Sequence, residues 1–181
     1  MLEIVFMLVN TVAGVLGTAL LLRAYMLWNG ISAFNPLGQF AYALTDWLVM
    51  PLRRLVPLPG RIDWPSLLAA YLVALAALAL LGLITGSLTL ASDGASALPV
   101  LALLILLRWA MYLVIGLTVL YALLSWINPR APLAPVTNAL VRPMLAPFRR
   151  FIPLIGGVDL SPLALILLAN IVLVIVGSIA R

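Results

Sequence analysis

The chain has 181 residues, of which 66% are hydrophobic and only 8% are charged. Soluble domains carry about 25% charged residues, and a chain of this length cannot hide so much apolar surface from water, so a soluble fold is excluded. The sequence contains no cysteine and no histidine, which excludes disulfides and thiolate metal sites and removes the commonest general base. We therefore expect no cofactor, no metal and no enzymatic activity.

Four nearly uncharged stretches predict four membrane-spanning helices, because a span needs about 20 mostly apolar residues. These spans cover roughly residues 2–30, 64–88, 98–127 and 160–180. The first stretch lacks the basic residues that precede the core of a secretory signal, so we interpret it as a retained span. The sequence thus predicts an all-α membrane protein.

Two long connectors separate the first span from the second and the third from the fourth. They are rich in proline, yet apolar residues recur in them at near-helical spacing, which favours a short amphipathic helix lying in the headgroup plane. These apolar residues are Phe40, Leu44, Trp47, Leu48, Val136, Leu140 and Leu145. An irregular loop folded over the spans is the alternative. Residues 92–97 form a short polar connector without basic residues.

The net charge of +5 comes from ten arginines that lie mostly in these connectors rather than on a polar domain. This pattern indicates membrane topology and not nucleic-acid binding. The connector arginines are Arg53, Arg54, Arg61, Arg130, Arg142, Arg149 and Arg150. By the positive-inside rule we expect both long connectors in the cytoplasm and both termini outside, in a bacterial inner (plasma) membrane.

An internal repeat appears when the sequence is shifted by 96 residues. Residues 25–71 then align without a gap to residues 121–167, and 15 of the 47 pairs are identical. Because each copy contains two spans, both copies insert the same way up and form a parallel repeat. We expect a first repeat over residues 1–91 and a second over residues 98–181.

The repeat carries one shared motif, P-x-R-R-x-x-P-x-x-G-x-x-D. Its residues are Pro51, Arg53, Arg54, Pro57, Gly60 and Asp63 in the first copy and Pro147, Arg149, Arg150, Pro153, Gly156 and Asp159 in the second. The first proline should end or kink the connector helix, and the second proline and the glycine should reverse the chain. The aspartate is positioned to cap the next span, where Pro162 suits the first turn. The motif is either only a turn and topology anchor, or also a site where the arginines bind lipid phosphates or a partner protein.

Two arginines interrupt the spans. Arg23 is close to the cytoplasmic end of its span, so we expect it to snorkel toward the headgroups. Arg108 lies about ten residues into the third span, where a charge costs about 2.5–3.5 kcal/mol on insertion scales. No acidic residue inside a span is placed to pair with either arginine, so Arg108 should face protein, water or another subunit. Snorkelling with local lipid deformation is the alternative.

The second copy contains the runs Leu124-Ser125-Trp126-Ile127-Asn128-Pro129, Arg142-Pro143, Pro147-Phe148-Arg149-Arg150 and Gly156-Gly157-Val158-Asp159-Leu160-Ser161-Pro162. These runs are similar to the YggT (YlmG-like) family of small membrane proteins. The first copy departs from this pattern with Trp64-Pro65-Ser66. The resemblance implies associations with cell division, with osmotic or ion homeostasis, and with assembly of a plastid cytochrome complex.

These observations favour a non-enzymatic scaffold or assembly factor. We expect it to bind the anionic headgroups of membrane lipids and either partner proteins or further copies of itself. The alternative is a channel or transporter subunit that acts in osmotic or ion homeostasis.

Overall fold

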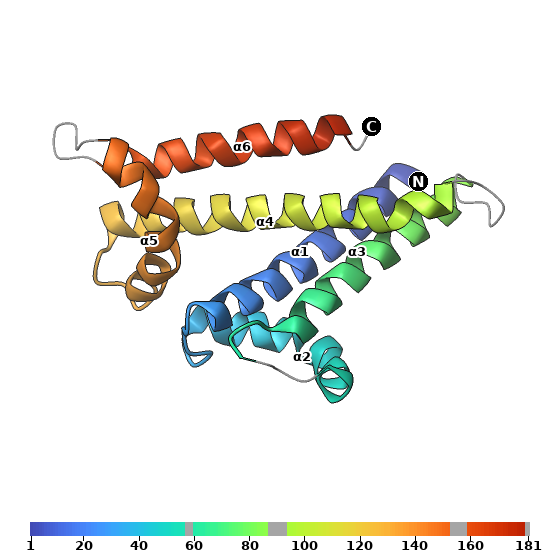
Figure 1. Cartoon of the computed structure of the whole chain (residues 1–181), viewed down its shortest axis with the longest axis horizontal. Helices are drawn as coiled ribbons and strands as arrows, with labels where there is room; N and C mark the ends of the chain where they lie inside the picture. Colours follow the sequence, from blue (N-terminus) through green and yellow to red (C-terminus); the bar gives the residue numbers. More distant parts are fainter. Residues whose placement is uncertain (57–59, 87–93, 153–158, 180–181) are drawn as a thin grey trace.

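The computed structural model describes residues 1–56, 60–86, 94–152 and 159–179. In these ranges the chain forms six α-helices and no strand (Figure 1). The helices are α1 (Leu2–Trp28), α2 (Pro36–Leu55), α3 (Trp64–Thr85), α4 (Gly94–Ile127), α5 (Ala134–Phe151) and α6 (Ser161–Ile179). Four of them, α1, α3, α4 and α6, are long and apolar enough to cross a membrane. The all-α class and the four spanning helices predicted from composition are therefore confirmed.

The helix ends differ by a few residues from the predicted spans. Helix α1 stops at Trp28, two residues before Gly30 turns the chain with a positive φ of 67°. Helix α3 stops at Thr85 because Gly86 takes a left-handed conformation. Helix α4 begins already at Gly94, so four of the six residues of the predicted connector 92–97 are helical. Alanine-rich sequence favours helix, which accounts for this early start. Asp93 lies outside the described residues.

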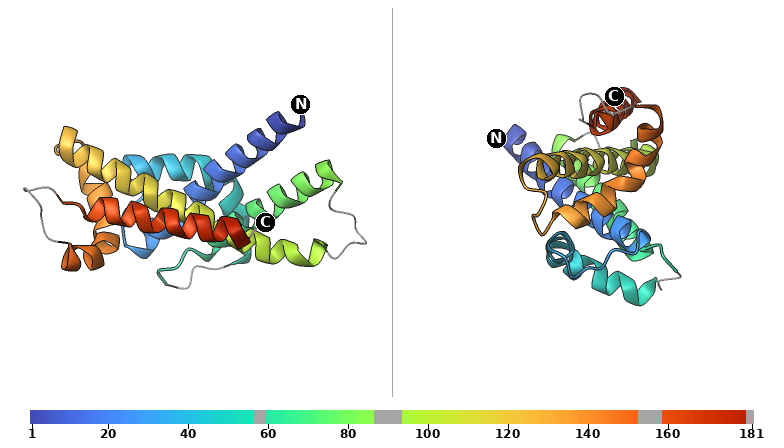
Figure 2. Two further views of the ribbon diagram at one scale, coloured as in Figure 1. Left: turned by 90° about the horizontal axis from the view of Figure 1, so that it is seen from above. Right: turned by 90° about the vertical axis from the view of Figure 1, so that its left-hand side faces the viewer.

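The spanning helices pack as two pairs. Helix α1 runs along α3, and α4 runs along α6, while α4 also packs against both α1 and α3 and so joins the two halves (Figures 1 and 2). The N-terminus and the end of α6 lie at the same end of the molecule, and α5 lies at the other (Figure 1). A buried cluster with Leu22 and Met26 of α1, Leu117 of α4 and Leu140 of α5 contains residues of both halves.

Most of each long connector is helical, so the irregular-loop alternative is wrong for residues 36–55 and 134–151. Helix α2 begins where Asn35 caps it by accepting a hydrogen bond from the Gly38 amide at 2.9 Å. It packs against α1 and α3, and α5 packs against α4 and α6. Each helix buries one side. The buried residues are Gly38, Ala41, Thr45 and Val49 in α2 and Thr137, Leu140, Val141 and Leu145 in α5.

The first proline of each motif was expected to end or kink its connector helix, and neither helix ends there. Helix α2 continues four residues past Pro51, and α5 continues four past Pro147. A proline removes one backbone hydrogen bond, but later bonds still close the last turn. The Val56 amide donates to the Leu52 carbonyl at 2.8 Å, and the equivalent bond in α5 is 2.9 Å long. The motif arginines therefore belong to the last helical turn, where positive charge complements the helix dipole.

Candidate functional site at the helix-capping aspartates

The two motif aspartates stand at the starts of α3 and α6. The Asp63 carboxylate accepts hydrogen bonds from the Ser66 amide at 3.3 Å and from the Ser66 hydroxyl at 2.8 Å, and Asp63 is fully buried. The Asp159 carboxylate accepts from the Ser161 amide at 2.9 Å. Pro65 and Pro162 occupy the first turns that follow. Both carboxylates thus satisfy helix amides that would otherwise lack a partner.

In the second half, Arg149 holds the end of α5 against this cap. Its Nε and Nη2 atoms lie 2.9 and 2.8 Å from Asp159 Oδ2, and Nη2 also donates to the Tyr121 hydroxyl at 2.9 Å. Partial burial alone would raise the pKa of Asp159, but hydrogen bonds from Ser161 and Arg149 outweigh it and lower that pKa. Partial burial would likewise lower the pKa of Arg149, yet Tyr121 and Asp159 raise it. The pair therefore stays ionised near neutral pH.

In the first half, the same cap belongs to a larger ionic cluster. Arg53 Nη2 lies 3.8 Å from Asp63 Oδ2, a looser contact than that of the equivalent Arg149. Arg23 approaches the same oxygen through its Nε atom at 3.5 Å and is itself fully buried. Asp63 is therefore shared between two arginines from different helices, α1 and α2.

Arg23 also reaches α2 directly. Its Nη1 atom donates to Asp46 Oδ1 at 2.6 Å and to the Thr45 hydroxyl at 3.3 Å, and its guanidinium carbon lies 3.9 Å from the centre of the Tyr42 ring. The expectation that Arg23 snorkels without an acidic partner is therefore wrong. Its partners lie on the connector helix α2 and at the cap of α3, so the sequence of the spans alone does not reveal them. We call Arg23, Asp46 and Asp63 the buried ion cluster.

The other two motif arginines face outward. Arg54 and Arg150 are exposed, and neither contacts an acidic group in the described part of the chain. The motif thus separates into one arginine per copy that is held by an aspartate and one that is available to a ligand. Gly60 adopts a positive φ of 82°, as a tight turn requires, whereas Pro57, Pro153 and Gly156 lie outside the described residues.

Arg108 stands apart from these clusters, at the surface of α4. It is exposed, and the protein within residues 1–56, 60–86, 94–152 and 159–179 offers it no ion pair. It lines a groove of about 410 Å³ between α1 and α4, together with Asn10, Thr18 and Tyr112. The protein chain alone therefore does not bury this charge.

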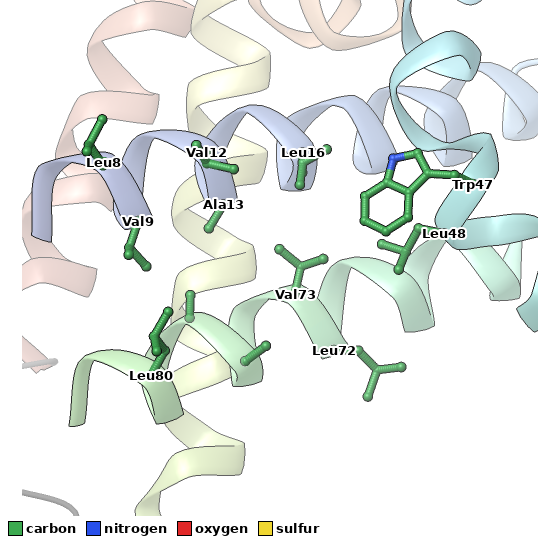
Figure 3. Close-up of a pocket in the computed structure, with 12 residues that line it drawn as sticks. Leu8, Val9, Val12, Ala13, Leu16, Trp47, Leu48, Leu72, Val73 and Leu80 are labelled. Carbon is green, nitrogen blue, oxygen red and sulfur yellow. The ribbon is translucent and has the colours of Figure 1, made fainter. Parts of the chain in front are cut away.

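A second groove, of about 570 Å³, is apolar and lies between α1, α2 and α3 (Figure 3). Leu8 and Leu80 line its end nearer the N-terminus, and Trp47 and Leu48 of α2 line the opposite end (Figure 3). It is long and almost wholly hydrocarbon-lined, which suits an acyl chain rather than a polar substrate.

Sequence reasoning missed three members of these clusters. Asp46 has no counterpart in the repeat, since the equivalent position holds Arg142, so the alignment gave no signal for it. Tyr121 was detectable, because it is identical to Tyr25 in the aligned copy. The two tyrosines act differently: the Tyr25 hydroxyl donates to the Leu140 carbonyl at 2.8 Å, while the Tyr121 hydroxyl accepts from Arg149. Tyr42 carried no distinguishing pattern. No cluster of three or more acidic residues gathers among the residues described.

Four spanning helices, two of them capped by aspartates that pair with arginines of the connector helices, define a multi-pass α-helical membrane protein. The CCB3/YggT family model matches residues 2–84 and 100–180, and the chain belongs to this family. The chain is 35% identical over 170 residues to the Escherichia coli K12 "Uncharacterized protein YggT", covering 91% of this chain and 85% of that one. A Vibrio alginolyticus protein, "Uncharacterized protein in proC 3'region", is 35% identical over 161 residues, covering 87% and 85%. No solved structure matches the chain.

Proposed function

We propose that this protein is a non-enzymatic membrane organiser that binds anionic lipid at its arginine-rich face and assembles with other membrane proteins. The observation that carries the proposal is that the two arginines of each motif make different contacts. Arg53 and Arg149 are tied to the capping aspartates, and Arg54 and Arg150 project beside them. Holding one arginine in place fixes the position of its neighbour, which reduces the entropy lost when a phosphate binds.

The surroundings of Arg54 support a lipid as the ligand. Trp47 precedes Arg54 by seven residues, or about two helical turns, and it also lines the apolar groove of Figure 3. Exposed Phe40, Trp47 and Met50 give α2 an apolar outer side, as expected for an amphipathic helix at the headgroup level. An acyl chain in the groove would bring its headgroup toward the end of the molecule where the motif arginines lie.

The lipid proposal predicts a loss of anionic lipid when the two exposed arginines are neutralised. Attraction to anionic lipid is worth about 1 kcal/mol per basic residue, so Arg54→Gln with Arg150→Gln should reduce retention by up to about 30-fold before screening. Native mass spectrometry of protein purified from phosphatidylglycerol-containing nanodiscs measures the retained lipid. Arg61→Gln with Arg130→Gln is the matched control, because it removes two exposed charges that the two copies of the repeat do not share. Equal losses of retained lipid in the two double variants would mean that the motif arginines act only as a topology signal.

Orientation is the second part of the proposal. The arginine count supports an orientation with both connector helices in the cytoplasm and both termini outside, in an inner membrane. Because the chain has no natural cysteine, single cysteines can be introduced without background. Ser32→Cys and Asn138→Cys should react in intact spheroplasts only with membrane-permeant maleimides, and Ser92→Cys should react with impermeant ones. The reverse labelling would place the connectors outside.

A further inference from the structure

Arg108 is charged, exposed and far from either membrane surface, and side chains that face lipid rarely combine these three properties. Tyr121, on the same helix, marks the ionic layer through its bond to Arg149. Arg108 is 13 residues from Tyr121, so at 1.5 Å per residue it lies about 20 Å from this layer. It lies about 16 Å from Ala97, where the apolar part of α4 begins. The depth places Arg108 inside the hydrocarbon core, which is about 30 Å thick.

The groove around Arg108 includes several polar side chains among its apolar ones, although lipid would surround it. Asn10 and Thr18 of α1 and Tyr112 of α4 line it together with Arg108. The Asn10 amide group donates to the Phe6 carbonyl of its own helix at 2.8 Å, which leaves its oxygen available as an acceptor. Arg108 and Tyr112 are four residues apart, so both lie on the same face of α4. A polar groove at this depth is expensive unless a polar partner fills it.

The floor of the groove fits an approaching helix. Ala13 and Gly14 of α1 and Ala77 of α3 line it with small side chains. Small residues let helix backbones come close in a membrane, where packing and interhelical hydrogen bonds drive association. The groove therefore has a floor that permits close helix contact beside a single positive charge.

The depth also decides between possible occupants. A lipid phosphate stays at the headgroup level, farther from Arg108 than one side chain reaches. A second copy of this chain cannot supply a matching carboxylate, because the only acidic residue within its four spanning helices is Glu3, at the very start of α1. A carboxylate near the middle of a transmembrane helix of another protein meets both the charge and the depth.

We infer that the groove of Arg108, Asn10 and Tyr112 docks a transmembrane helix of a partner protein that carries aspartate or glutamate near its midpoint. The inference rests on the proposed function, since it names the partner class of the membrane organiser. The partner carboxylate accepts hydrogen bonds from the Arg108 guanidinium and the Tyr112 hydroxyl, and its helix packs on Ala13, Gly14 and Ala77. Docking removes the uncompensated charge from lipid and supplies the partner with the counter-charge that its own carboxylate needs.

Designed helices test this docking directly. Donor-labelled protein, with Ser32→Cys as the dye site, is reconstituted in phosphatidylcholine vesicles with acceptor-labelled leucine–alanine helices of about 20 residues. The probes carry one central glutamate, one central glutamine, or one glutamate near an end. Energy transfer should show about ten-fold tighter association with the central-glutamate probe than with the other two. Arg108→Leu should abolish this preference, and Arg108→Lys should retain part of it.

The control variant is Asn170→Leu, which removes another exposed intramembrane polar residue from α6 and should leave the preference unchanged. Equal binding of the three probes, or a preference that survives in Arg108→Leu, would overturn the inference. Self-association, phosphatidylglycerol retention or ion flux that depends on Arg108 would instead assign the groove to a second copy, a lipid or an ion path. The Arg54/Arg150 variant separates the two proposals, because it should lose anionic lipid while keeping the glutamate preference.

Discussion

Arg23→Leu is expected to lower the free energy of unfolding by about 3–5 kcal/mol, the cost of removing one partner from a buried ion pair. Arg23 and Asp63 are both fully buried, and the only arginine left beside Asp63 would be Arg53, in the looser contact at 3.8 Å. The loss should also release α2 from α1, since Arg23 contacts Asp46, Thr45 and Tyr42 on that helix. Denaturant unfolding in lipid bicelles measures both effects, followed by Trp47 fluorescence in proteins whose other four tryptophans are replaced by phenylalanine.

The double variant Arg23→Leu with Asp63→Asn should recover much of this loss. Asparagine still caps the helix but leaves no buried charge without a partner. Asp46 needs no second substitution, because its side chain is 36% exposed and can be solvated. Arg108→Leu is the comparison variant, and it should leave the stability of the isolated protein unchanged or higher. An Arg23→Leu protein as stable as the wild type would show that the buried ion cluster contributes no net stabilisation.

Gly17→Ala is expected to destabilise the join between the two halves by about 1–3 kcal/mol, as overpacking of a buried contact does. A Cβ atom at Gly17 of α1 would lie 2.0, 2.2 and 2.6 Å from three ring atoms of Trp109 in α4. Trp109 is only 6% exposed, so its ring has little space in which to move. The ring packs directly on the glycine backbone, and even one methyl group must push the helices apart.

Gly116→Ala provides the matched control in α4. A Cβ atom there meets nothing within 4 Å, and alanine favours helix by up to about 1 kcal/mol, so this variant should be neutral or stabilising. Trp109→Leu combined with Gly17→Ala should cost less than the sum of the two single changes, because leucine relieves the clash. Thermal unfolding in detergent compares Gly17→Ala, Gly116→Ala, Trp109→Leu and the double variant with the wild type. Equal melting temperatures for Gly17→Ala and Gly116→Ala would contradict the close packing.

Features encoded locally were predictable from the sequence. Uncharged runs of spanning length gave the four long helices, and apolar spacing in residues 32–63 and 128–159 gave the two connector helices. The spacing of Asp63 before its span also indicated its place at the start of α3. Such signals depend on neighbours within a few residues, where periodicity and capping act.

Contacts between distant segments were not predictable in the same way. Arg23 is 23 residues from Asp46 and 40 from Asp63, so only the folding of α2 across α1 brings them together. Arg53 and Arg149 were assigned to lipid phosphates because nothing local showed that the capping aspartates turn toward them. The sequence around each arginine therefore shows where the charge is, but it does not show which distant aspartate pairs with it.

The buried ion cluster shows one way in which a chain with two repeats can differ from a dimer of two identical single-repeat chains. Asp46 aligns with Arg142, and Arg23 aligns with Val119, so the first half contains a charge network that the second half has no residues to build. In a homodimer of single-repeat chains, each position is the same residue in both subunits, and any such network must occur twice or not at all. Covalent linkage of the copies removes that symmetry constraint. The first half can then bind its connector helix α2 through the buried ion cluster. The second half has an exposed arginine, Arg142, at the position that corresponds to Asp46.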